Sequence, residues 1–360
     1  MEQYTTYCYK FNFYNSKWAA VHAAHLDGLN AEEIYANIDT YLGGTKSFFG
    51  NLNTTIEPTD SWDTMLKDRA QYLRDTLPSI NLCFSGGHDS YFMLKTFLDN
   101  NIPIDRIIIE RYIPQIDPEL NYEQTNVALK LLKLLDIGKA EVIVSDWNDI
   151  STWVDFALNE NTYFESGLQL FPNLGDVAYR LTSERNVKGE PMIRGSVHPR
   201  VYYKDGHWRS HMWDSDNWGG AYTNPNFIPF YTDSRFPKIH LKQLHLTKNY
   251  LEKYNNRNIT EREDNIEYKH CYVNAVRSAT PEVIFNTPFQ MMSLDDDSSH
   301  SLFKNLYQHM TKKKEKFFLT MAKERKNDFE KLYNIFNTKL GGLPMMFHKS
   351  FLRIYDVPLD

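Results

Sequence analysis

Residues 84–92 read FSGGHDSYF and follow the short apolar run INLC at residues 80–83. The apolar run predicts a buried strand, and the residues from His88 onward predict a helix. A strand, a glycine-rich turn and a helix N-terminus together form a phosphate cradle, because free main-chain N–H groups and the helix dipole point to the same place. The two glycines let the backbone approach an anion closely, and the serines on either side carry hydroxyl donors.

Asp89 is the unexpected residue in this stretch. A carboxylate beside a phosphate group is repelled unless a divalent cation lies between them. Mg²⁺ held by one carboxylate and several phosphate oxygens is the usual arrangement. The stretch therefore predicts a site for ATP or another nucleotide with Mg²⁺, and Asp89 is the candidate metal ligand.

The composition is that of a globular protein with ample core. The chain has 360 residues, 14% of them aromatic, and a formal charge of −6, which disfavours nucleic-acid binding by bulk attraction. Its three cysteines form no CxxC pair, as expected in a reducing compartment. With no apolar run of about 18 residues and no signal-peptide pattern, we expect a cytoplasmic protein without membrane contact, in the host cytoplasm if the source is a virus.

Strand and helix patterns alternate from residue 59 onward, which predicts an α/β fold: a parallel sheet with helices on both faces. The chain after residue 240 reads as mostly helical, with a long charged helix over 302–336. We expect three regions: a small α+β segment at 1–58, the sheet domain at 59–240 and a helical C-terminal region at 241–360. The predicted strands cover 79–84, 105–112, 140–147 and 191–197, and the predicted helices between them cover 59–77, 88–100, 124–138, 148–160 and 171–186.

The flanking regions carry weaker patterns. Residues 4–21 predict one or two strands, and residues 29–42 predict a helix that ends at Gly43 and Gly44. Residues 201–213 predict a hairpin that turns at Asp205-Gly206, and residues 211–236 read as a loop layer.

Residues 85–90 match the SGGxDS signature of the PP-loop ATP pyrophosphatases, between a predicted strand and a predicted helix as that family requires. The stretch from about residue 60 to 200 most resembles the synthetase domain of asparagine synthetase and β-lactam synthetase. The resemblance implies an adenine nucleotide alpha hydrolase-like fold, and an enzyme that adenylates a substrate and releases pyrophosphate from ATP.

The resemblance also implies roles for individual residues. Those that would hold the nucleotide lie at or just after the ends of the four predicted strands, and Asp89 would ligate Mg²⁺. Arg194 and Lys204 are the candidates for stabilising charge on the α-phosphate, so they join Asp89 as candidate catalytic residues. The candidate nucleotide-binding residues are Ser85, Gly86, Gly87, His88, Asp89, Ser90, Ile109, Glu110, Asp146, Gly195 and Ser196.

The chain departs from asparagine synthetase in two places. Residues 194–199 read RGSVHP where that family carries an acidic Gly-Glu-Gly-x-Asp-Glu loop. With Arg194 and His198 there, we expect an anionic acceptor rather than a cationic one, and aspartate is disfavoured as substrate. Glu2 rather than a cysteine follows Met1, so we expect no glutaminase activity within this chain.

Three functions remain open at this stage. The first is an AMP-forming, C–N bond-forming ligase that acts on a small-molecule acceptor. The second is a PP-loop enzyme that modifies a nucleobase in tRNA or DNA, although nucleic acid is the less favoured partner. The third is a nucleotide-binding module without catalysis, which the presence of Asp89 and Ser90 disfavours.

Two further features allow a purely structural interpretation as well as a functional one. Cys83 precedes the loop and is expected to be a small buried apolar residue rather than a thiol catalyst. Trp208, Trp213, Trp218 and Tyr222 either stack on a substrate ring or simply pack the loops.

Overall fold

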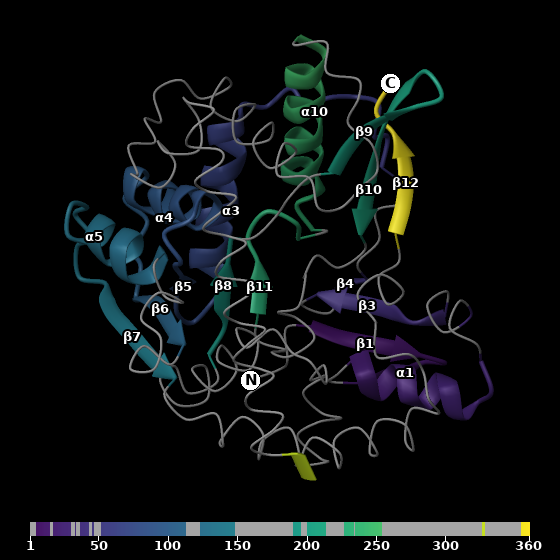
Figure 1. Ribbon diagram of the computed structural model, residues 1–360, viewed down its shortest axis with the longest axis horizontal. Coiled ribbons are helices and arrows are strands. Elements are labelled where there is room, and N and C mark those ends of the chain that lie inside the picture. The colour runs from purple at the N-terminus through teal and green to yellow at the C-terminus, as the bar shows by residue number, and fades with distance from the viewer. Residues whose placement is uncertain are drawn as a thin grey trace.

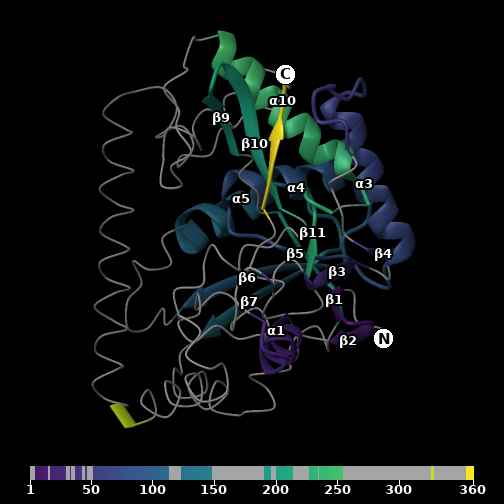
Figure 2. The ribbon, with the colours of Figure 1, turned by 90° about the vertical axis from the view of Figure 1, so that its right-hand side faces the viewer.

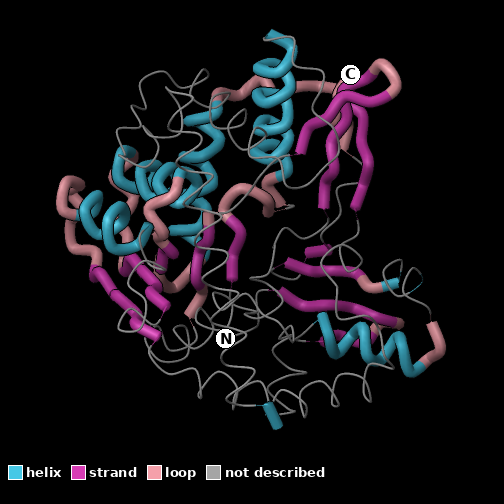
Figure 3. Tube along the Cα trace, viewed as in Figure 1, coloured by secondary structure: helices cyan, strands magenta, loops and turns pink. Residues whose placement is uncertain are grey.

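Three β-sheets form the framework of the described chain (Figures 1 and 3). One is a five-stranded parallel sheet, and the other two, of four and three strands, are antiparallel. The computed structural model describes residues 5–14, 17–29, 33, 37–42, 45–46, 52–112, 123–147, 190–195, 200–213, 227–233, 235–253, 326–327 and 354–360.

The parallel sheet has the strand order β11-β8-β5-β6-β7. From β5 the chain adds β6 and β7 on one side of the sheet, and then β8 and β11 on the other side. The order therefore reverses between β5 and β8, which confirms the predicted parallel sheet and the α/β class. The strands are β5 (Asn81–Cys83), β6 (Arg106–Tyr112), β7 (Glu141–Trp147), β8 (Met192–Arg194) and β11 (Phe227–Pro229).

The main core lies between this sheet and its helices. Leu82, Ile107 and Ile193 share one face of the sheet and are fully buried against side chains of the helices. The opposite face buries Cys83, Ile108 and Met192 in a second cluster. Burial on both faces explains the continuous apolar run in β6. The helices are α3 (Trp62–Thr76), α4 (His88–Asp99), η2 (Glu123–Ala128), α5 (Leu129–Leu132) and α10 (Pro237–Lys253).

Helix positions agree with the sequence pattern at α3, α4 and α5, with differences at their ends. Helix α3 begins at Trp62, because the Ser61 hydroxyl accepts from the Thr64 N–H at 3.1 Å and caps the helix. The predicted helix at 124–138 opens with a π-helical segment, η2, before α5. The predicted helices at 148–160 and 171–186 lie outside the described residues, as does the predicted helix at 302–336 apart from residues 326 and 327.

The N-terminal part corrects two predictions: residues 17–21, expected in a strand, begin helix α1 (Lys17–Leu26), and the end of the helix predicted at 29–42 is a strand. Strands β1 (Thr5–Tyr9) and β2 (Asn12–Tyr14) were expected, but residues 39–42 form strand β3 (Asp39–Leu42) rather than the end of a helix. Pairing of β3 with β1 overrides the helical pattern there. Helix α1 (Lys17–Leu26) and strand β4 (Thr45–Lys46), which pairs with β3, complete this part.

The three-stranded sheet confirms the hairpin. Strands β9 (Arg200–Lys204) and β10 (His207–Trp213) turn at Asp205 and Gly206, whose φ angles of 52° and 88° are those of a type I′ turn. A distant strand, β12 (Ile354–Pro358), pairs with β10.

The predicted loop layer at 211–236 is wrong at two points: strand β10 extends to Trp213, and β11 begins at Phe227. Helix α10 starts at residue 237, just after this layer, and runs across residue 240. No helix in the described ranges is both long and apolar enough to cross a membrane.

Candidate nucleotide site

The loop after β5 holds a conformation that requires glycine. The Phe84 N–H still donates to the Ile108 carbonyl at 2.8 Å, so the chain leaves the sheet only at Ser85. Gly86 then has a φ of +85°, and a Cβ there would lie 2.7 Å from the main-chain nitrogen of Ala128 in η2. Both the left-handed backbone and the close approach of η2 exclude a larger residue.

The two serines of the signature brace this loop from inside. The Ser85 and Ser90 hydroxyl oxygens lie 3.2 Å apart, and the Ser90 hydroxyl donates to the Gly87 carbonyl at 3.0 Å. The Gly87 N–H donates to the Ser85 hydroxyl at 3.2 Å. The two hydroxyls were expected to contact phosphate directly. In this structure they fix the shape of the loop.

Helix α4 begins at the end of this loop. Its N-cap is Gly87, so no side chain caps the helix. Asp89 is partly exposed in the first turn, where a negative charge is favoured by the helix dipole. One carboxylate beside an uncapped helix end is a donor set that fits Mg²⁺, which takes most of its ligands from phosphate oxygens and water. The His88 side chain lies outside the described part of the structure.

The carboxyl end of β8 lies directly against α4. A Cβ at Gly195 would be 2.9 Å from the Asp89 carbonyl oxygen and 3.2 Å from the ring of Tyr231. The Tyr231 hydroxyl donates to the same Asp89 carbonyl at 2.7 Å. The structure thus brings the predicted residues Asp89 and Gly195 together, while Ser196 lies outside the described residues.

Arg194 and Glu110 lie on the same face of the sheet as Cys83. The register pairs Arg194 with Cys83 and Cys83 with Ile108, so Glu110 projects two residues beyond the end of β5. Burial raises the pKa of the Cys83 thiol well above its usual value; the charge of Glu110 raises that pKa further, and the charge of Arg194 lowers it. Cys83 is therefore the buried, protonated thiol that the sequence predicts.

The nearly buried Glu110 changes the expected electrostatics. Arg194 was predicted to make this end of the sheet positive and so to favour an anionic acceptor. Glu110 and Arg194 shift the pKa of the Cys83 thiol in opposite directions, so a carboxyl group lies at this end of the sheet as well as a guanidinium group. A preference for anions does not follow from Arg194 alone.

The remaining predicted residues of β6 and β7 divide between core and edge. The Ile109 side chain is fully buried in the main core, so only its main chain could meet a ligand. Asp146 accepts two hydrogen bonds from Arg111, at 2.6 Å each. This bond to Asp146 raises the pKa of Arg111 and fixes a charged pair at the carboxyl edge of the two strands.

Lys204 is not brought to the loop. It is exposed at the β9–β10 turn, in another sheet, away from the start of α4 in both views (Figures 1 and 2). Trp208 is buried in a separate core cluster, edge-on to Tyr203 at 5.1 Å, so it packs the protein rather than facing a ligand. Trp218 and Tyr222 lie outside the described residues, as does the side chain of Trp213.

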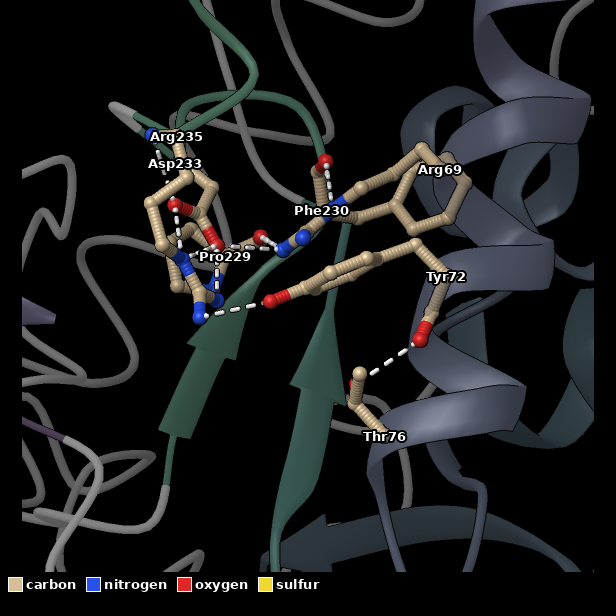
Figure 4. A network of polar contacts seen from close by, with 7 residues as sticks. All are labelled: Arg69, Tyr72, Thr76, Pro229, Phe230, Asp233 and Arg235. Carbon is tan, nitrogen blue, oxygen red and sulfur yellow. Dashed lines mark hydrogen bonds and ion pairs between the residues drawn. The ribbon is translucent and has the colours of Figure 1, made fainter. Parts of the chain in front are cut away.

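The sequence did not predict a buried charge cluster at the carboxyl end of β11 (Figure 4). Arg69 of α3 is fully buried; it donates to the carbonyls of Pro229 and Phe230 at 2.8 and 3.2 Å and pairs with Asp233 at 2.8 Å. Arg235 pairs with the same carboxylate at 2.6 Å. Burial lowers the pKa of Arg235 to about 10, so it stays charged at neutral pH. The cluster holds the segment that carries Tyr231.

Neither a scan of protein-family models nor a search of curated proteins finds a match to this chain. The site is therefore interpreted from its own geometry and chemistry.

Proposed function

We propose that the protein binds ATP with Mg²⁺ at the 85–90 loop and uses it to adenylate an acceptor, with release of pyrophosphate. One observation carries this proposal: the SGGHDS stretch lies at the carboxyl end of β5, where the strand order reverses between β5 and β8. Open α/β sheets bind nucleotides in the crevice at that point. Numbered along the chain, the order is 3-2-1-4-5, which is that of doubly wound nucleotide-binding sheets.

The chain supplies the parts that such a transfer needs. Main-chain N–H groups at the first turn of α4 would hold the phosphates, because the first N–H groups of a helix have no partner within the helix. Asp89 would hold Mg²⁺, which when bound neutralises charge on the phosphate oxygens. Arg194, across the reversal point on β8, would stabilise charge that develops at the α-phosphate.

The proposed reaction has two steps. An acceptor oxygen, most simply of a carboxylate, forms a bond to the α-phosphorus as the bond from that phosphorus to the bridging oxygen breaks. Pyrophosphate leaves with the electron pair. An amine then attacks the carboxyl carbon of the acyl-adenylate, and the bond from that carbon to the AMP oxygen breaks. AMP leaves with the electron pair and the nitrogen releases a proton to solvent, which gives a C–N bond. The protein contributes positioning and charge stabilisation rather than a covalent intermediate.

The test compares two aspartates of the same helix. The protein is incubated with ATP, Mg²⁺ and a metabolite pool, and pyrophosphate and adenylated products are measured by mass spectrometry; ATP affinity is measured by calorimetry. We expect Asp89→Ala to abolish turnover and to weaken Mg²⁺-dependent ATP binding by about tenfold or more. Asp99→Ala, at the far end of α4 and ion-paired with Lys95, should behave as the unaltered protein.

Each other outcome has a defined meaning. Pyrophosphate release that needs added tRNA or DNA would transfer the assignment to nucleobase modification. ATP binding with no release under any condition would identify a nucleotide-binding module. Equal Mg²⁺-dependent ATP binding by Asp89→Ala and the unaltered protein would refute the site.

A further inference from the structure

Tyr231 bridges the two halves of the candidate site. It follows β11 by two residues, and its side chain is buried, with 1% exposure. Its hydroxyl donates to the main-chain carbonyl of Asp89, 142 positions earlier, at 2.7 Å. A hydrogen bond of this length from a buried donor fixes the accepting carbonyl closely.

The ring of Tyr231 is held on several sides. It stacks on Trp62 with a centroid separation of 6.2 Å and an interplanar angle of 2°, and it meets Phe230 edge-on at 5.0 Å. Gly195 approaches so closely that a Cβ there would lie 3.2 Å from the ring and 2.9 Å from the Asp89 carbonyl oxygen. The hydroxyl therefore has little freedom to leave the Asp89 carbonyl.

The backbone that carries Tyr231 is anchored as well. Arg69 donates to the carbonyls of Pro229 and Phe230, the two residues just before Tyr231, and pairs with Asp233 just after it (Figure 4). Because the Arg69 and Asp233 side chains are both fully buried, this anchor is shielded from solvent. Through the bond from Tyr231 to Asp89, this anchor helps to fix the first turn of α4.

The main-chain pairing between these two halves is short. Strand β5 pairs with β8 over only two residue pairs, Leu82 with Ile193 and Cys83 with Arg194. Asp89 and the end of β8 lie beyond these two residue pairs, on opposite sides of the candidate site. The Tyr231 hydroxyl and the close packing of Gly195 connect them there.

We infer that Tyr231 is a positioning residue, which sets the Asp89 turn against the carboxyl end of β8 so that metal and phosphates are held in one geometry. This inference rests on the proposed function, because it concerns the same site. It assigns Tyr231 no contact with the nucleotide. We expect loss of the Tyr231 hydroxyl to reduce the gain in nucleotide affinity that Mg²⁺ gives, and not only the stability of the fold.

The experiment uses Tyr231→Phe, which keeps the ring and removes the hydroxyl. Binding of the non-hydrolysable α,β-methylene analogue of ATP is measured by calorimetry without metal and over a series of Mg²⁺ concentrations, so the readout does not depend on turnover. We expect the affinity without metal to be retained and the gain from Mg²⁺ to fall about tenfold, as when the groups that orient a metal ligand are removed.

The matched control is Tyr72→Phe. It also removes one tyrosine hydroxyl contact, a partly buried one from Arg235 at 3.2 Å. The Arg69 bonds to Pro229 and Phe230 and the Tyr231 bond to Asp89 stay in place. We expect it to lower the thermal midpoint without changing the response to Mg²⁺. A Tyr231→Phe protein that loses stability but keeps the full response would show a merely structural role and overturn the inference.

Gly195→Ala gives an independent approach to the same carbonyl. Its added Cβ pushes the Asp89 main chain from the β8 side, so the response to Mg²⁺ should weaken in the same way. This variant decides the matter if Tyr231→Phe does not fold, and an unchanged response would then count against the inference. Asp89→Ala distinguishes failure of the proposed function from failure of the Tyr231 inference. If Asp89→Ala keeps the full response to Mg²⁺, the proposed function fails. If Asp89→Ala loses the response while Tyr231→Phe and Gly195→Ala keep it, only the role of Tyr231 is refuted.

Discussion

Replacing Gly86 with alanine should destabilise the protein through two separable effects. The φ of +85° costs an L-residue about 1–2 kcal/mol. The new Cβ would also lie 2.7 Å from the Ala128 nitrogen and 2.9 Å from its Cα, and forcing such a contact costs about 1–3 kcal/mol. We therefore expect a total loss of about 2–5 kcal/mol in the free energy of unfolding.

Gly206→Ala is the matched control for this prediction. Gly206 has a nearly equal φ of +88°, but nothing lies within 4 Å of a Cβ there. It should therefore lose only the conformational part, about 1–2 kcal/mol. Urea denaturation followed by circular dichroism measures both variants, and their difference reports the contact between the loop and η2.

A further variant tests the identity of that contact. Because the nearest atoms of Ala128 are its main-chain nitrogen and Cα, adding Ala128→Gly to Gly86→Ala should restore little stability. The reasoning is refuted if Gly86→Ala and Gly206→Ala lose equal stability, or if Ala128→Gly restores most of the loss.

Two further predictions concern buried charge. Asp233→Ala leaves Arg69 and Arg235 without their shared carboxylate and should cost about 3–5 kcal/mol in urea denaturation; a loss below about 1 kcal/mol would contradict the buried ion pair. Burial lowers the pKa of His240 from 6.5 to about 4, so the unfolded chain takes up a proton that the folded protein does not, and stability should fall as the pH drops from 6.5 towards 4. His240→Gln should remove about 3 kcal/mol of that pH dependence; unfolding midpoints that fall equally with pH in both proteins would contradict it.

The central part of the fold could be predicted from the sequence because its signals are local. The β-branched run of β6 and the adjacent glycines after β5 each specify their own backbone without help from distant residues. The Asp205-Gly206 turn is equally local, since both residues adopt the positive φ that a type I′ turn requires.

The rest depends on contacts between distant residues. Strand β11 has only three residues, one of them Pro229, and it becomes a strand by pairing with β8. Arg69 and Asp233 carry no local signal of their pairing; Arg69 bonds the carbonyl of Phe230, 161 positions later.

The candidate site shows the same division. The sequence predicted the 85–90 loop between a strand and a helix, where the structure has it. The bond from Tyr231 to Asp89 spans 142 positions, and neither residue carries a local signal of it. Glu110 was predicted only as a nucleotide-binding residue, whereas its place on the same sheet face as Cys83 and Arg194 follows from the strand register.

The pairing of β12 with β10 constrains when this part of the chain can fold during synthesis. The Trp208 N–H donates to the carboxylate of Asp360, 152 positions later, and the Thr54 hydroxyl donates to the carbonyl of Pro358, 304 positions later. Until residues 354–360 emerge from the ribosome, this sheet has only the strands β9 and β10, packed against α10, and lacks its third strand. The edge of β10 is then open to other chains. A stalled or truncated nascent chain should therefore aggregate through β10, even though every residue of the 85–90 loop has already been made.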